Sequence, residues 1–208
     1  MSIESLLKVA APVVPVVVIQ SVEHALPLAE ALLKGGVKSI EVTLRSAAAL
    51  PAIEALAKAE TGIIIGAGTI LNATHWQQAA NAGAHFGVSP GLCPSLLALQ
   101  KEAPIPLLPG AVTASEIQTA IEAGFKFLKF FPAESSGGAA AVKSFAGPFQ
   151  DIVFCPTGGI SIATAPDYLS LSNVACIGGS WLTPAKLLAE SNWAEITRLA
   201  QACQALAK

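Results

Sequence analysis

A regular alternation of apolar runs and amphipathic stretches is the feature of this sequence that most restricts its fold. The amphipathic stretches, such as SVEHALPLAEALLKGG, repeat apolar residues at the spacing of a helix. The apolar runs have the length of strands and number eight, at 13–19, 39–44, 63–67, 85–89, 105–109, 125–131, 152–155 and 174–177. Eight strand–helix units joined by short loops predict an α/β fold of the (β/α)8 TIM-barrel type.

An open doubly wound sheet would produce a similar alternation, and the count of eight units favours the barrel. No linker, low-complexity run or change of composition divides the chain. We therefore expect a single (β/α)8 barrel domain over residues 1–208, with a short N-terminal helix before the first strand.

Three segments share one pattern, in which the end of a helix leads through a glycine into a strand. They read LLKGGVKSIEVTL, AANAGAHFGVSPG and AIEAGFKFLKFFP. We expect Gly36, Gly83 and Gly124 to end their helices with a positive φ, which glycine adopts without steric cost. Their spacing places them before the second, fourth and sixth strands.

The composition restricts the partners. Hydrophobic residues make up 53% and charged residues 12% of the chain, against about 25% charged residues in an average soluble domain. So little charge hints at stable self-association. The net charge is −2 and no basic cluster occurs, so we expect neither nucleic acid nor an anionic membrane as a partner.

The cysteines and the N-terminal segment indicate the compartment. The four cysteines are far apart and form no CxxC pair, and the three histidines lack metal-ligand spacing. Buried, inert thiols without a metal site fit a reducing cytoplasm. The apolar stretch at 11–19 is broken by two prolines and is too short to span a bilayer. No basic region precedes it, so we expect no signal peptide.

The second strand carries polar residues at alternate positions. Ser39, Glu41, Thr43 and Arg45 share one direction, and the apolar residues between them share the other. In a barrel the polar set faces the interior or its mouth, where it needs partners or a ligand. A solvent-facing edge strand is the alternative.

The sixth strand raises the same question. Lys129 shares its direction with Phe127 and Phe131, and it lies near the carboxyl end of the strand. A desolvated lysine amine is the nucleophile of Schiff-base chemistry. Apolar surroundings and the charge of Arg45 favour the neutral amine, whereas direct contact with Glu41 favours the ammonium. A purely structural ion pair between Lys129 and Glu41 is the alternative.

Small residues follow most of the strands. They occur as GAGT (66–69), SPG (89–91), PGA (109–111), TGG (157–159) and GGS (178–180). Barrel enzymes hold their active sites at these carboxyl ends, and backbone amides there can bind phosphate. Tight turns are the alternative for each loop. The glycines of GAGT do not form a dinucleotide fingerprint, because a further glycine and an acidic partner are missing.

Six motifs in order resemble the 2-keto-3-deoxy-6-phosphogluconate (KDPG) aldolase and 4-hydroxy-2-oxoglutarate aldolase family. They are EVTLR (41–45), GAGTILN (66–72), SPG (89–91), KFFPAE (129–134), CPTGGIS (155–161) and CIGGSWL (176–182). The resemblance implies a small (β/α)8 barrel, usually a homotrimer, that is a metal-free class I aldolase without a cofactor. Such enzymes cleave KDPG to pyruvate and glyceraldehyde 3-phosphate in the Entner–Doudoroff pathway, with side activity on 4-hydroxy-2-oxoglutarate.

The resemblance also implies roles for residues of this chain. Lys129 corresponds to the Schiff-base lysine and Glu41 to the general acid/base. Further positions divide into groups that bind the substrate carboxylate (Arg45, Thr69), line the pocket (Phe131, Thr43, Pro90) and bind the phosphate (Gly158, Gly159, Gly179, Ser180). Strand 2 is similar to that of the gluconate branch rather than the galactonate branch, which tends to carry Pro and Asn at positions 43 and 45.

Two other functions are compatible with a phosphate-binding barrel. A sugar-phosphate isomerase or epimerase would use carboxylates or a metal and leave Lys129 structural. A catalytically silent barrel would only bind a phosphorylated keto acid or serve as an oligomer scaffold. The inward positions of both Lys129 and Glu41 argue against the silent barrel, because binding alone needs no desolvated amine.

Overall fold

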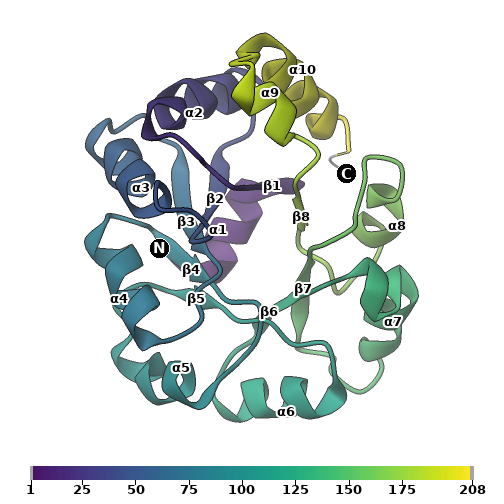
Figure 1. Ribbon diagram of the computed structural model, residues 1–208. Helices are drawn as coiled ribbons and strands as arrows, with labels where there is room; N and C mark the ends of the chain where they lie inside the picture. Colours follow the sequence, from purple (N-terminus) through teal and green to yellow (C-terminus); the bar gives the residue numbers. More distant parts are fainter. Residues whose placement is uncertain (1, 207–208) are drawn as a thin grey trace.

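The computed structural model describes residues 2–206 and shows strands and helices that alternate along the chain (Figure 1). The strands are β1 (Val13–Val17), β2 (Ser39–Thr43), β3 (Ile64–Gly68), β4 (Phe86–Val88), β5 (Leu107–Leu108), β6 (Phe127–Phe130), β7 (Val153–Pro156) and β8 (Ile177–Gly179). The helices are α1 (Ile3–Ala10), α2 (Ala25–Lys34), α3 (Ala49–Lys58), α4 (Ala73–Asn81), α5 (Pro94–Leu99), α6 (Ala114–Glu122), α7 (Gly138–Phe145), α8 (Ala165–Leu169), α9 (Ala185–Ala189) and α10 (Trp193–Gln204). Short 3₁₀ turns lie at Val22–His24, Gln100–Glu102 and Glu134–Ser136.

The strands are parallel and form a curled sheet with helices around its outer face (Figure 1). One sheet has six strands in the order β5-β4-β3-β2-β1-β8, and a second has the pair β6-β7. Isolated parallel bridges join the two sheets: Gly110 pairs with Lys129 between β5 and β6, and Thr157 pairs with Gly178 between β7 and β8. The prediction of a parallel α/β fold is confirmed.

The eighth strand is displaced from its predicted position. It covers Ile177–Gly179 rather than 174–177, while Val174 forms only an isolated bridge with Phe154. The prediction followed the apolar residues at 174–177. The backbone pairing with β1 instead extends through Gly178 and Gly179, which pair with Val14 and Pro15. The glycines expected after the strand therefore belong to it.

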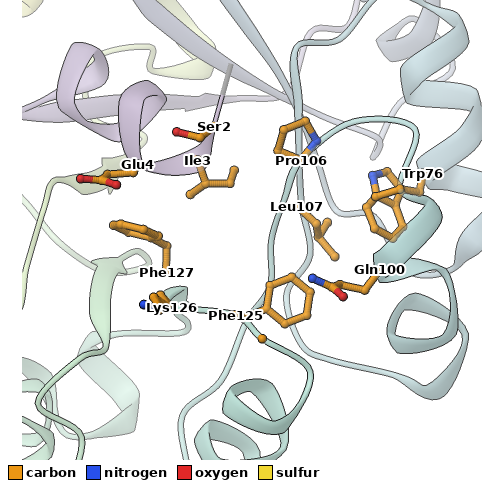
Figure 2. A pocket seen from close by; sticks show the side chains of 12 residues that line it. Ser2, Ile3, Glu4, Trp76, Gln100, Pro106, Leu107, Phe125, Lys126 and Phe127 are labelled. Atoms are coloured by element: carbon orange, nitrogen blue, oxygen red, sulfur yellow. The ribbon is translucent and has the colours of Figure 1, made fainter.

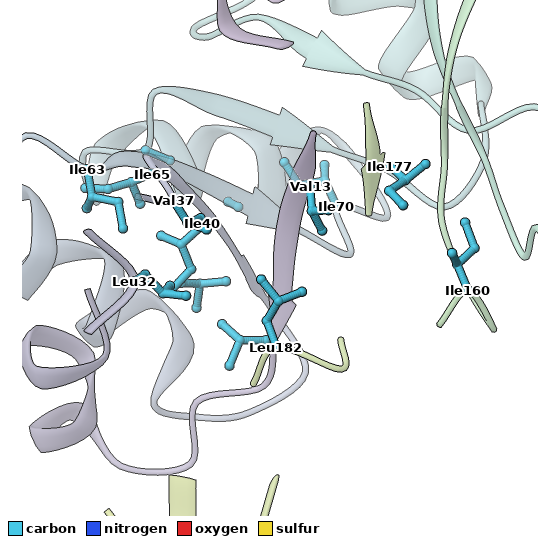
Figure 3. Packing of buried hydrophobic residues seen from close by; sticks show 14 of the residues in the cluster. Val13, Leu32, Val37, Ile40, Ile63, Ile65, Ile70, Ile160, Ile177 and Leu182 are labelled. Carbon is cyan, nitrogen blue, oxygen red and sulfur yellow. The ribbon is translucent and has the colours of Figure 1, made fainter. Parts of the chain in front are cut away.

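The apolar core has two parts. The larger part fills the space between the strands and the surrounding helices, with residues such as Ile40, Ile65 and Leu32 (Figure 3). The smaller part lies on the inner face of the strands and includes Val14, Phe86 and other residues that alternate with the first set. This two-sided burial explains why the strands read as continuous apolar runs.

The helix α1 packs against the inner part of the core. Leu6 and Leu7 are fully buried in the same cluster as Ile64 and Leu108 of the strands. Burial of a leucine side chain contributes about 1.5–3 kcal/mol. The side chain of Ser2 accepts a hydrogen bond from the amide of Ser5 and caps the helix. The predicted N-terminal helix is thus confirmed.

The three predicted glycine caps are also confirmed. Gly36, Gly83 and Gly124 have φ values of 87°, 92° and 87°. At the first of them, Gly36 N donates to Leu33 O and Val37 N to Leu32 O, which is the bond pair of a Schellman motif. The same two bonds recur at the ends of α4 and α6.

Within residues 2–206, no helix combines the length and the apolar character that a membrane crossing requires. Three cysteines, Cys155, Cys176 and Cys203, are buried free thiols as predicted, whereas Cys93 is only partly buried.

Candidate functional site

A lysine from β6 and a glutamate from β2 meet on the inner side of the curled sheets. Lys129 Nζ lies 3.2 Å from Glu41 Oε1, and the two residues are 5% and 4% exposed. Glu41 comes from β2, whose five residues are all buried between β1 and β3. The alternative of a solvent-facing edge strand is therefore wrong, and the polar face of β2 points inward.

A cavity of about 160 Å³ surrounds this pair near the carboxyl ends of the strands. It contains the predicted catalytic, carboxylate-binding and pocket residues: Glu41, Thr43, Arg45, Thr69, Pro90, Lys129 and Phe131. These residues lie on β2 and β6 or in the segments that follow β2, β3, β4 and β6, so the fold brings together residues that are far apart in the sequence.

Two further residues of the cavity were missed by sequence reasoning. Val16 lies on β1 in register with Glu41, and Thr157 follows β7. Thr157 is the first residue of the TGG loop, in which only the two glycines were predicted to bind substrate. The alternation of β1 could have indicated Val16, but an apolar residue within an apolar run gives no signal of its own.

The guanidinium of Arg45 is oriented by a chain of hydrogen bonds through Thr43 to the backbone of β1. Thr43 Oγ1 donates a hydrogen bond to Val17 O at 2.9 Å, and Arg45 Nε donates to Thr43 Oγ1 at 3.1 Å. Thr43 is buried, while Arg45 is exposed at the mouth. Because Nε is engaged, the two terminal nitrogens remain available for the fork-like grip that arginine offers a carboxylate.

Thr69 has a backbone conformation that is unusual for its residue type. Its φ is 61°, and a β-branched residue in this region is a genuine outlier. Such strain costs on the order of 1–3 kcal/mol and concentrates at functional sites. Thr69 directly follows β3 and lines the same cavity as Arg45.

Aromatic surface covers the amine on one side. Lys129 Nζ lies 5.0 Å from the ring centroid of Phe131, a cation–π distance. A Cβ added to Gly158 would lie 3.2 Å from the same ring. Phe131 thus separates the lysine from the loop after β7.

Glycines within β3 give the glutamate its space. The predicted strand ended at residue 67, within GAGT, but β3 extends to Gly68. Gly66 and Gly68 therefore both lie inside it, in register with Glu41 and Thr43. A Cβ on Gly68 would overlap the Glu41 carboxylate, and one on Gly66 would overlap the ring of Phe86. These positions are small because side chains from neighbouring strands occupy the inner face.

The predicted phosphate-binding residues lie outside the lining of this cavity. Gly158 and Gly159 have φ values of 103° and 80° in the loop after β7. Gly179 is the last residue of β8, and Ser180 follows it on the surface. The bridge between Thr157 and Gly178 holds the two loops next to each other and next to the cavity.

A larger cavity, of about 320 Å³, lies at the opposite end of the strands (Figure 2). Its walls include Phe125, Phe127, Trp76 and Leu107, with α1 on one side. Its charged side chains, Glu4 and Lys126, are exposed. The smaller cavity is the better candidate for chemistry, because it alone of the two contains a buried amine and a buried carboxylate.

Two interpretations of the buried pair were left open by the sequence, and the contact itself is compatible with both. A buried ion pair contributes little stability compared with apolar residues of the same volume. The surroundings favour chemistry: a guanidinium with free donors, a strained threonine and an open cavity adjoin the pair. Among residues 2–206, no group of three or more metal-ligating His, Cys, Asp or Glu side chains is found.

Comparison with known proteins gives a consistent result. Residues 3–199 match the family model for KDPG and KHG aldolase, where KHG is 4-hydroxy-2-oxoglutarate. The chain is 50% identical over 200 residues to the KHG/KDPG aldolase of Escherichia coli (strain K12), which covers 96% of this chain and 93% of that protein.

Two solved structures agree closely with the fold. The KDPG aldolase of Zymomonas mobilis ATCC 29191 is 43% identical, with a TM-score of 0.94 over 100% of this chain and 98% of that one. The KDPG aldolase of Legionella pneumophila, solved with pyruvate as a covalent carbinolamine intermediate, is 42% identical. Its TM-score is 0.92 over 97% of each chain.

Proposed function

The chain belongs to the KDPG and KHG aldolase family, and on this basis we propose that it is a class I aldolase, a carbon–carbon lyase that cleaves KDPG to pyruvate and glyceraldehyde 3-phosphate. One observation carries the proposal: the amine of Lys129 lies 3.2 Å from the carboxylate of Glu41 in a cavity that also contains Arg45. The covalent carbinolamine of pyruvate in the Legionella relative supports the same chemistry, which needs no cofactor.

The reaction begins with the amine. Transfer of one ammonium proton from Lys129 to Glu41 across their contact leaves a neutral nucleophile. Its nitrogen attacks the C2 ketone of the substrate to give a carbinolamine. Glu41 then returns its proton to the departing hydroxyl, so that loss of water leaves an iminium on Lys129 and a carboxylate on Glu41. Arg45 and Thr69 hold the adjacent carboxylate, which fixes the ketone beside the amine.

The iminium then serves as the electron sink. Glu41, directly or through a water, removes the proton of the C4 hydroxyl, and the electrons of the C3–C4 bond move to the iminium as an enamine. The aldehyde leaves, Glu41 returns a proton to C3, and hydrolysis frees pyruvate and Lys129. Since 4-hydroxy-2-oxoglutarate yields the same enamine, we expect it to be a side substrate. Phe131, Thr43 and Pro90 form the walls of this pocket.

The substrate phosphate is assigned to the loops after β7 and β8. The amides of Gly158, Gly159 and Gly179 and the hydroxyl of Ser180 are the donors in this proposal. Their positions beside the cavity support it, and barrel enzymes commonly bind phosphate after strands 7 and 8.

The wider organisation follows the family. We propose a single closed (β/α)8 barrel domain, supported by the bridges between the two sheets, in a homotrimer in the cytoplasm. Light scattering of the purified protein tests the trimer, and a monomeric mass would contradict it.

Substitution of the lysine tests the proposed activity. Lys129→Ala is expected to abolish pyruvate release from KDPG. Lys126→Ala is the matched control and should leave this activity unchanged, because Lys126 is exposed and precedes the strand that contains Lys129. Removal of Lys129 leaves Glu41 buried without a partner, which costs about 3–5 kcal/mol. Lys129→Arg keeps a positive charge there, and circular dichroism shows whether each variant is folded. Normal turnover in a folded Lys129 variant would refute the proposal.

A further inference from the structure

The loop after β6 is hydrogen-bonded to the loop after β7. Ala133 N donates to Thr157 O at 2.8 Å, and Glu134 N donates to Gly158 O at 3.1 Å. Ala133 is fully buried, so this end of the contact is fixed. The two loops lead into α7 and α8, which lie next to each other on the outside of the fold (Figure 1).

The side chain of Glu134 continues this contact to the next residue. A Cβ added to Gly159 would lie 2.7 Å from both Cβ and Cγ of Glu134. The methylene groups of the glutamate therefore lie directly against the backbone of Gly159. Gly158 and Gly159 both have positive φ, and glycine pairs of this kind have many conformations when nothing restrains them.

Tyr168 of α8 fixes the glutamate from the other side. Its hydroxyl donates a hydrogen bond of 2.6 Å to Glu134 Oε1, and Tyr168 itself is only 1% exposed. Desolvation, together with the neighbouring Glu134 carboxylate, raises the pKa of Tyr168, so the hydroxyl keeps its proton and remains a donor.

We propose that Glu134 and Tyr168 are positioning residues that hold the Gly158–Gly159 amides in place for the substrate phosphate. This inference rests on the proposed function. Neither residue lines the Lys129 cavity, so the pair acts on the phosphate end and not on the reacting carbons. It therefore contributes to the preference for phosphorylated keto acids, because a preorganised loop loses less freedom on binding.

The two proposed substrates separate this role from a general structural one. Removal of the contact is expected to weaken the binding of KDPG, which carries a phosphate. The binding of 4-hydroxy-2-oxoglutarate, which carries no phosphate, should be unchanged. In Tyr168→Phe and Glu134→Ala we expect the KM for KDPG to rise about tenfold. The kcat for KDPG and both constants for 4-hydroxy-2-oxoglutarate should stay within about twofold of wild type, since the reacting groups are untouched.

Glu134→Gln is the matched control. It keeps the methylene groups against Gly159 and an oxygen that accepts the Tyr168 hydrogen bond, so its KM for KDPG should stay near that of wild type. A Glu134→Gln variant that behaves like Glu134→Ala would show that charge, not positioning, matters. Equal losses on both substrates, or no loss on KDPG, would also overturn the inference. If wild type cleaved neither substrate, the proposed function itself would fail.

Discussion

Gly68 is the position where one added methyl group should disturb the chemistry without touching the substrate. In Gly68→Ala the new Cβ would lie 2.8 Å from Cγ and Cδ of Glu41, and nearer still to Oε1. Carbon atoms in contact are about 3.5 Å or more apart. The carboxylate must therefore move by roughly 0.7 Å or more from its place 3.2 Å from Lys129 Nζ.

A displacement of this size has a calculable consequence for turnover. Misplacement of a catalytic group by about 1 Å can cost about 100-fold in rate, which corresponds to about 2.7 kcal/mol of activation free energy. We expect the kcat for KDPG cleavage to fall by about this factor. Overpacking adds a loss of about 1–3 kcal/mol in the free energy of unfolding, which leaves a folded protein at assay temperature.

The assay follows pyruvate release by coupling it to lactate dehydrogenase and NADH oxidation. Gly91→Ala is the matched control, since a Cβ there would meet nothing within 4 Å. Urea unfolding reports the stability of both variants. A folded Gly68→Ala enzyme whose turnover equals that of Gly91→Ala would show that the position of Glu41 does not limit the reaction.

Three further predictions concern single side chains. Glu41→Gln should lower the kcat for KDPG by about 10²–10⁴ in steady-state assays, yet still allow an imine with pyruvate to be trapped; an unchanged kcat would exclude Glu41 from proton transfer. Arg45→Lys loses the bond to Thr43 and the forked grip, so the KM for KDPG should rise about tenfold in the same assay, whereas an unchanged KM would contradict this. His85 Nδ1 accepts a hydrogen bond from Ile65 N, and desolvation lowers the pKa of His85 although part of the ring stays exposed. Its contribution to stability is therefore present above about pH 6.5 and lost as the pH falls below it, so wild type should lose more stability than His85→Phe in urea titrations at pH 7.5 and 5; equal losses would refute this.

The fold could be predicted because apolar periodicity reports burial. Seven of the eight strands lie within their predicted ranges or extend them by one residue, and the glycines at three helix ends had the predicted positive φ. The eighth strand was misplaced because its last two residues are glycines, which carry no apolar signal although their backbone pairs with β1. Gly68 lay outside the predicted third strand for the same reason.

The candidate site could be predicted only in part. Alternation along two strands indicated that Glu41 and Lys129 point inward, and the structure brings them into contact. The roles taken from the family resemblance remain predictions. Glu134 and Tyr168 escaped notice because their contact joins an exposed acid in one loop to the side chain of a distant helix. No local pattern in the sequence reports such a contact.

Reduction with borohydride in the presence of pyruvate tests the central claim most directly. Mass analysis of the intact protein and of its peptides then locates any reduced adduct. The proposed mechanism predicts one pyruvyl group per chain, on the peptide that contains Lys129, and none in Lys129→Arg. An adduct on another lysine, or a folded wild-type protein that forms none while it cleaves KDPG, would contradict the assignment of Lys129 as the nucleophile.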